Sequence, residues 1–176
     1  MACKRFLFLV LVLVLSLSSH LVSADDSSAT CVYTVYVRTG SIWKGGTDSN
    51  ISLALIDYLG EEIYTSNLES WGGLMGPGYN YFERGNLDIF SGRGPCLSAP
   101  VCKMILSSDG TGPHHGWYCN YVEITSTGPH IPCNQQLFTV EQWLATDVNP
   151  YELTAERDLC ESSEIRAKGG SQLRLD

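Results

Sequence analysis

The sequence predicts an all-β protein, an antiparallel β-sandwich of about eight strands in two sheets. Segments rich in Val, Ile, Thr and aromatic residues recur along the chain. Clusters of Gly, Pro, Asn and Asp separate these segments at the spacing that is typical of a sandwich. Six cysteines beyond the amino-terminal segment also favour a secreted domain that is held together by disulfides.

The first 24 residues are predicted to be a cleaved secretory signal peptide. Lys4 and Arg5 precede an almost purely apolar run over 6–17, and the small residues before the expected cut end at Ala24. The run is too short to cross a bilayer core of about 30 Å as a helix. We therefore expect a soluble mature protein that enters the secretory pathway.

The mature chain is strongly acidic. Removing the signal takes away two of the 11 basic residues and none of the 19 acidic ones, which leaves a net charge of about −10. Such a chain lacks a basic footprint for nucleic acid. It is also not expected to bind anionic lipid by charge alone, so either a cation bridges the two or any membrane contact is apolar.

The cysteines predict two or three disulfides, with 15 possible pairings for six thiols. In the segment that begins at Trp117, Cys119 shares a strand face with that tryptophan, and a buried free thiol is the alternative there. That alternative leaves five cysteines, one of them unpaired. The six are Cys31, Cys96, Cys102, Cys119, Cys133 and Cys160.

Alternation of side chains places the strands. In the second strand Ile51, Leu53 and Leu55 face inward, while Ser52 and Ala54 face outward. The expected strands are 31–39, 51–55, 81–91, 99–106, 117–126 and 137–144. The sandwich is predicted to span 25–155, with an extended loop at 71–78, and a mobile charged tail over 156–176 with a short helix around 158–168.

One glycosylation sequon precedes the second strand. Asn50 is followed by Ile51 and Ser52, and its outward phase makes it usable as an acceptor in a secreted protein.

Four tracts occur in a fixed order along the chain: Thr39-Gly40, Gly46-Thr47-Asp48, Phe82-Glu83-Arg84-Gly85 and Trp117-Tyr118. Their order and spacing, over roughly 31–151, resemble those of a PLAT domain, the β-sandwich at the amino end of lipoxygenases. With a signal peptide and no catalytic domain after the sandwich, the chain looks like the small stand-alone PLAT proteins of plants. The resemblance implies a role in abiotic or biotic stress responses, and a location in the endoplasmic reticulum or the apoplast.

The resemblance also implies a calcium site built from loops at one end of the sandwich. Calcium takes oxygen ligands, and the matching positions are the carbonyls of Gly46 and Thr47, the carboxylate of Asp48, Asn80, the carbonyl of Tyr81, and Glu83. The third loop departs from the family pattern, because His114 and His115 stand where an acid or amide is expected; Asp109 is a possible substitute. The alternative is that Asp48 caps its own turn and Glu83 pairs with a cation.

Trp43 occupies the position where lipoxygenase PLAT domains expose an aromatic that inserts into lipid headgroups. Tryptophan suits an interface because its ring is apolar and its N–H is polar. The alternative is a ring folded back over the end of the sandwich. Trp117 and Trp143 are expected in the core.

The sequence gives little support to a zinc site or to hydrolase activity. A zinc site would need His114 and His115 on one metal with Cys119 or Asp109, although adjacent strand residues point to opposite faces. A secreted hydrolase lacks support, since there is no Gly-x-Ser-x-Gly motif and the paired carboxylates lie in solvated turns. The sequence therefore predicts a monomeric, non-enzymatic protein that docks to membrane lipid or to a protein partner through calcium-organised loops. The alternative is a metal-independent protein-interaction domain.

Overall fold

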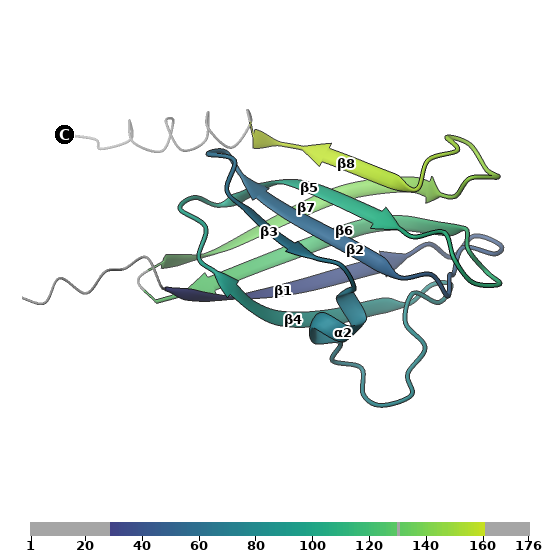
Figure 1. Ribbon diagram of the computed structural model, residues 1–176, viewed down its shortest axis with the longest axis horizontal. Coiled ribbons are helices and arrows are strands. Elements are labelled where there is room, and N and C mark those ends of the chain that lie inside the picture. The colour runs from purple at the N-terminus through teal and green to yellow at the C-terminus, as the bar shows by residue number, and fades with distance from the viewer. Residues whose placement is uncertain (1–28, 130, 161–176) are drawn as a thin grey trace, which may run out of the picture.

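A computed structural model describes residues 29–129 and 131–160 of the 176-residue chain. Two four-stranded antiparallel sheets stack face to face (Figure 1). The first sheet has the order β4-β1-β6-β7 and consists of β1 (Thr30–Thr39), β4 (Leu87–Pro95), β6 (Trp117–Gly128) and β7 (Ile131–Leu144). The second has the order β3-β2-β5-β8 and consists of β2 (Ile51–Asp57), β3 (Glu62–Thr65), β5 (Val101–Ser108) and β8 (Thr154–Asp158). The predicted β-sandwich is confirmed.

The core lies between the sheets and follows the predicted alternation. In β1, Tyr33, Val35 and Val37 are buried, whereas the residues between them are half-buried on the outer face. Phe82 stacks on Phe90, with ring centroids 5.5 Å apart. This apolar contact anchors the loop that precedes β4 to the sandwich.

The outer face of β2 differs from expectation at one position. Ala54 is buried, although its phase points it outward. It lies opposite Tyr64 of β3 and Ile105 of β5. Because β2 has a neighbour on each side, these longer side chains cover the alanine methyl group.

The strand predicted over 81–91 begins later than expected. β4 starts at Leu87, and the residues before it form turns in which Phe82 (φ 58°) and Gly85 (φ 78°) have left-handed backbones. The Phe82 N–H donates to the buried Asp88 carboxylate at 2.7 Å. Its donor is therefore satisfied by a side chain and not by a neighbouring strand.

The predicted loop at 71–78 also contains more structure than expected. A short helix, α2 (Leu68–Gly72), begins after Asn67, whose side chain accepts a hydrogen bond from the Ser70 N–H. The Trp71 ring packs against β4 at Gly92, where an added Cβ would lie 2.2 Å from the ring. Only glycine leaves room for the indole at that point.

The carboxyl-terminal boundary of the sandwich was placed too early. β8 continues to Asp158, beyond the predicted limit at 155, and Cys160 forms a disulfide with Cys102 of β5. The start of the predicted tail is thus a paired edge strand. The rest of that tail and the predicted signal peptide (residues 1–24) lie outside the described residues.

Two disulfides confirm the prediction of two or three. Besides the Cys102–Cys160 bridge, Cys31 of β1 pairs with Cys96. Cys119 is a buried free thiol, as the alternative reading predicted, and Cys133 is the unpaired exposed one. No helix in the described part of the chain is both long and apolar enough to cross a bilayer.

The topology gathers four loops at one end of the sandwich. β1, β5 and β7 end there, and β2, β4, β6 and β8 begin there (Figure 1, right-hand end). We call this end the loop pole; its loops are 40–50, 80–86, 109–116 and 145–153. All the residues predicted to bind calcium or membrane lie in it.

Candidate functional site

The loop between β1 and β2 presents Trp43 to solvent. The Gly45 N–H donates to the Ile42 carbonyl at 3.1 Å, which closes a tight turn with Trp43 and Lys44 at its centre. Lys44 has a left-handed backbone (φ 60°). The Trp43 side chain is 77% exposed, so its ring is not folded back over the sandwich.

The second loop lies directly against the first. The Thr47 N–H donates to the Phe82 carbonyl at 3.1 Å, and the Gly85 N–H donates to the Gly40 carbonyl at 3.1 Å. A Cβ added at Gly46 would lie 2.8 Å from the Arg84 nitrogen. The Gly-Thr-Asp tract therefore needs its glycine because another main chain passes beside it.

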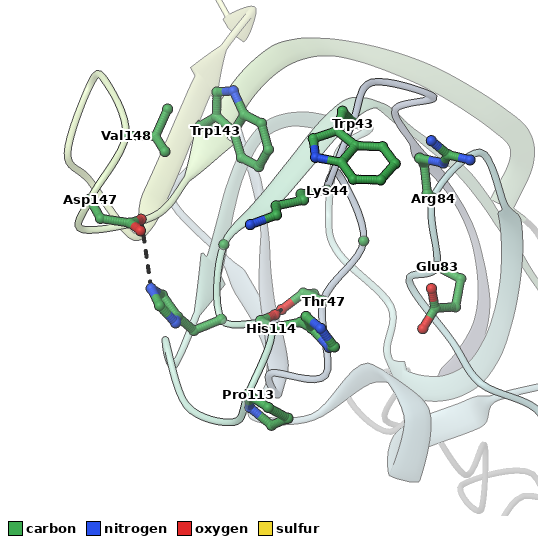
Figure 2. Close-up of a pocket in the computed structure, with 13 residues that line it drawn as sticks. Trp43, Lys44, Thr47, Glu83, Arg84, Pro113, His114, Trp143, Asp147 and Val148 are labelled. Carbon is green, nitrogen blue, oxygen red and sulfur yellow. Dashed lines mark hydrogen bonds and ion pairs between the residues drawn. The ribbon is translucent and has the colours of Figure 1, made fainter.

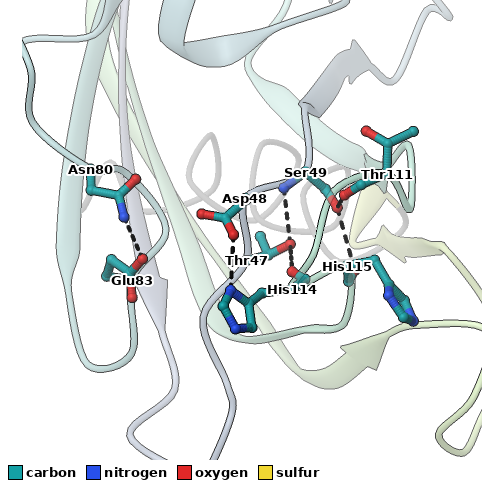
Figure 3. A network of polar contacts seen from close by, with 8 residues as sticks. All are labelled: Thr47, Asp48, Ser49, Asn80, Glu83, Thr111, His114 and His115. Atoms are coloured by element: carbon teal, nitrogen blue, oxygen red, sulfur yellow. Dashed lines mark hydrogen bonds and ion pairs between the residues drawn. The ribbon is translucent and has the colours of Figure 1, made fainter.

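The third loop, 109–116, is fastened to the first through its main chain. The His114 carbonyl accepts hydrogen bonds from the Asp48 N–H at 3.3 Å and from the Thr47 hydroxyl at 2.7 Å. The Ser49 hydroxyl donates to the Thr111 carbonyl at 2.6 Å. Thr47 and Ser49 are buried, so these bonds hold the loops as one unit (Figure 3).

The two predicted calcium carboxylates have nitrogen partners (Figure 3). Asp48 Oδ2 lies 2.9 Å from His114 Nδ1, and Glu83 Oε1 accepts from the Asn80 amide at 2.5 Å. Tyr81 is buried, and its hydroxyl accepts from the Met75 N–H at 2.8 Å. The sequence alternative was therefore wrong in detail: Glu83 pairs with an amide rather than a cation, and the Asp48 side chain contacts a histidine from another loop.

Asp109, the possible substitute ligand, serves its own loop. Its carboxylate accepts from the Asn50 amide at 2.9 Å and from the Thr111 N–H at 3.0 Å. Partial burial alone would raise the pKa of Asp109, but the hydrogen bonds from Thr111 and Asn50 outweigh it and hold that pKa below its ordinary value. This carboxylate braces the loop pole.

The side chains as arranged fall short of a calcium cage. Within 29–129 and 131–160, no three His, Cys, Asp or Glu residues form a group that could hold a metal ion. The predicted ligand set contains two carboxylates, and one oxygen of each already contacts a nitrogen, whereas calcium takes six to eight oxygens. The shared zinc site is also not formed, because His114 contacts Asp48 and His115 contacts Asp147.

A groove of about 820 Å³ opens between these loops and the β7–β8 loop (Figure 2). Trp143 lines it and is only half-buried, which corrects the prediction that it lies in the core. It pairs with Tyr118 on the outer face of its sheet, while Leu144 pairs with Trp117 on the inner face. The Tyr118 and Trp143 rings meet edge to face at 5.5 Å.

Sequence reasoning missed two cations of the groove, Lys44 and Arg84. The Arg84 guanidinium carbon lies 5.8 Å from the centre of the Trp43 ring, a cation–π contact. Lys44 follows Trp43 and Arg84 belongs to the Phe82–Gly85 tract, so both positions are visible in the sequence, but their orientation depends on the loop contacts.

The two-sheet antiparallel sandwich has the fold of the lipoxygenase PLAT domain. Among solved structures, the lipoxygenase Delta413-417:GS I805W LOX matches 82% of this chain with a TM-score of 0.51 and 20% identity. Coral 8R-lipoxygenase matches 80% with a TM-score of 0.51 and 19% identity. The chain spans 20% of the length of each lipoxygenase, and these likenesses show the fold alone.

Sequence comparison is more specific. A profile of the family described as Embryo-specific protein 3 (ATS3) matches residues 17–148. PLAT domain-containing proteins 2 and 1 of Arabidopsis thaliana are 58% and 55% identical to this chain over 173 residues, which cover 97% of it and 94% and 95% of theirs. The chain belongs to the ATS3 family, and its similar relatives are stand-alone PLAT domain-containing proteins.

Proposed function

We propose that this PLAT protein is a non-enzymatic module of the secretory pathway that docks onto a membrane surface through its loop pole. The PLAT fold and the PLAT domain-containing relatives support a binding module. The observation that carries the proposal is the 77% exposure of Trp43 at the tip of the β1–β2 loop.

An exposed indole on a braced loop is suited to an interface. Trp43 keeps its N–H in the polar layer while its ring enters the apolar layer. Ile42 (40% exposed) and Tyr151 (63% exposed) lie in loops of the same pole and enlarge the apolar contact. The main-chain bonds between the loops hold these side chains in place before they meet a membrane, which lowers the entropic cost of docking.

Co-sedimentation of the purified mature protein with phospholipid vesicles tests the proposal. We expect pelleting with vesicles, and we expect Trp43→Ala to weaken the vesicle-binding constant at least about tenfold, since full burial of a large side chain contributes about 1.5–3 kcal/mol. Tyr58→Ala is the matched control, because Tyr58 is an exposed aromatic in the β2–β3 turn at the opposite end. Absence of pelleting with every lipid would contradict membrane docking and favour the metal-independent protein-interaction domain.

Calcium at Gly46, Thr47, Asp48, Asn80, Tyr81 and Glu83 is a separate proposal. It is supported by the juxtaposition of the two loops and by the likeness to coral 8R-lipoxygenase, a protein described as activated by calcium through a C2-like domain. Asp48 and Glu83 each use one carboxylate oxygen for a present partner, and only two side-chain carboxylates belong to the site, so we expect an affinity in the weak range of extracellular modules. Calorimetric titration with calcium should show binding heat in the wild type and none in Asp48→Asn. Asp147→Asn is the control, because Asp147 also contacts a histidine but lies outside the proposed ligand set, and it should retain the heat.

From the family resemblance we also propose that the protein lies in the secretory pathway and takes part in stress responses.

The glycosylation sequon can be tested directly. Asn50 is exposed, although its side chain also bonds to Asp109 and Asn67. We expect glycosylation at Asn50, seen as a mass decrease on glycosidase treatment that Asn50→Gln removes. Fluorescent tagging of the protein in plant cells would separate endoplasmic reticulum from apoplast, and transcript levels under drought, salt and pathogen challenge would test the stress role.

A further inference from the structure

The groove beside Trp43 contains acids that have polar partners and cations that have no carboxylate partner. Asp147 Oδ1 lies 3.6 Å from His115 Nε2, and Glu83 accepts from the Asn80 amide. In the described part of the chain, no carboxylate oxygen lies within 4.0 Å of a Lys44 or Arg84 nitrogen. The two cations of this groove therefore have no carboxylate partner among the described residues and are available to bind an anionic group, although the whole chain is acidic.

Lys44 is held beside the indole by its backbone. It is the third residue of the turn from Ile42 to Gly45, with a φ of 60°, where glycine or asparagine is usual. A lysine in this left-handed conformation costs stability, and the neighbouring loop bonds keep it there. The turn carries the ammonium group out to the same tip as the Trp43 ring.

Arg84 reaches the indole from the second loop. Its guanidinium lies over the Trp43 ring, and in Figure 2 Lys44 and Arg84 stand on either side of that ring. The bond from the Thr47 N–H to the Phe82 carbonyl ties their loops together. Both cations therefore meet a surface at the same time as the indole.

We propose that Lys44 and Arg84 bind the phosphate groups of anionic phospholipids on either side of an inserted Trp43, without a calcium bridge. The inference rests on the proposed membrane docking and names the lipid class. Basic groups near an anionic surface each strengthen binding about fivefold. A guanidinium matches two phosphate oxygens, and an ammonium acts as a point charge.

Screening limits how far the negative net charge opposes this contact. At physiological ionic strength the screening length is about 8 Å, so acids at the opposite end of the sandwich are largely screened from a membrane at the loop pole. The acids of the pole itself are Asp48, Glu83, Asp109, Asp147 and Glu152, and the first four each face a hydrogen-bond donor or a histidine. These acids act against the contact locally, so it depends on Lys44 and Arg84 meeting the headgroups beside the inserted indole.

Vesicle binding in EDTA tests the inference. We compare phosphatidylcholine vesicles with vesicles that also contain phosphatidylglycerol, using the purified mature protein. We expect tighter binding to the anionic vesicles, a loss of about fivefold for Lys44→Gln and for Arg84→Gln, and a double variant that binds both vesicles equally. Arg84→Lys should keep most of the affinity that Arg84→Gln loses. Arg93→Gln is the control, since Arg93 is an exposed, unpaired cation of the described strand β4, near the end away from the loop pole.

The outcomes separate this inference from the docking proposal. The wild type could bind both vesicles equally, with Trp43→Ala weakening the binding and Lys44→Gln and Arg84→Gln leaving it unchanged. That result would overturn the inference and leave docking intact. Preference for anionic vesicles only when calcium is added would overturn it in favour of an ion bridge. Absence of binding to any vesicle would overturn both and point to a protein partner. Circular dichroism of each variant confirms that the sandwich is folded.

Discussion

Asp88 shows how one buried acid shapes the loop that carries Glu83 and Arg84. Its side chain is fully buried, and one carboxylate oxygen accepts the Phe82 N–H at 2.7 Å. That bond stabilises the left-handed backbone at Phe82 and lets the Phe82 ring enter the core. Burial raises the pKa of Asp88, although the Phe82 N–H acts in the opposite direction.

Replacing Asp88 separates its hydrogen bond from its charge. We expect Asp88→Ala to lower the free energy of unfolding by about 1–3 kcal/mol, because it strands a buried N–H group. Asp88→Asn keeps an acceptor without a charge and should cost less. Urea unfolding at neutral pH measures both variants; equal losses would show that the Phe82 bond contributes nothing.

The same residue gives the wild type a defined pH dependence. The folded pKa lies above the unfolded value of about 3.9, so the folded state binds the proton more tightly. The contribution of Asp88 to stability is therefore fully present below pH 4 and declines as the pH rises through the raised folded pKa. Asp88→Asn should remove this part of the decline, as urea unfolding between pH 4 and 7 would show; parallel curves for the two proteins would contradict it.

β8 shows why some elements were predictable from the sequence and others were not. β1 alternates clearly and was placed within a residue, because each face of the strand meets a different environment. β8 is polar apart from Ala155 and has no such pattern. What holds it is distant in sequence: Lys103 contacts Glu156 at 2.5 Å and Asp158 at 3.6 Å, and Cys160 is bonded to Cys102.

The disulfide should pin β8 to its sheet. Removing it with Cys102→Ser and Cys160→Ser is expected to lower the free energy of unfolding by about 2–4 kcal/mol, because the bridge closes a long loop in the unfolded chain. Hydrogen exchange should accelerate most in β8. Cys133→Ser is the control with an exposed free thiol and should change little; unchanged exchange in β8 would refute the pinning role.

Arg157 connects the two sheets along their β7 and β8 edges. Its guanidinium donates to the main-chain carbonyls of Thr139 at 2.9 Å and Val140 at 2.5 Å. We expect Arg157→Ala to lower the unfolding free energy by about 1–2 kcal/mol, since partial exposure weakens charge-assisted bonds. Arg157→Lys should recover only part, because an ammonium lacks the fork that spans both carbonyls. Thermal unfolding of these variants measures the losses. Arg93→Ala is the control and should stay within about 0.5 kcal/mol of the wild type.

At the scale of the whole molecule, the antiparallel topology brings distant residues together at the loop pole. The four tracts predicted that the loops of Asp48 and Glu83 converge, and the main-chain bonds between them confirm it. The contact of Asp48 with His114 was not predictable, because it forms between loops 66 residues apart, and the local bond of Asn80 to Glu83 depends on the turn between them. Net charge sums over the chain and does not show which charges lie at one end, so the positions of Lys44 and Arg84 beside Trp43 could not be read from it.

The two free thiols offer a test of how the sandwich opens as a unit. Cys133 is exposed, whereas Cys119 is fully buried in β6, between β1 and β7. Burial raises the pKa of the Cys119 thiol, and only the thiolate reacts with a maleimide. We expect rapid labelling at Cys133 and labelling at Cys119 only through global unfolding.

This expectation links thiol reactivity to the other variants. If Cys119 reacts only from the unfolded state, each loss of about 1.4 kcal/mol in stability speeds its labelling tenfold, as long as refolding outpaces the reaction. Asp88→Ala and Arg157→Ala should therefore raise the rate of Cys119 labelling, with the logarithm of the rate rising in proportion to the measured loss of stability. The rate at Cys133 should not change. Mass spectrometry of the purified mature protein follows both rates. If neither substitution changes the labelling rate of Cys119, the maleimide reaches β6 through a local opening between β1 and β7. The sandwich would then not open as one cooperative unit.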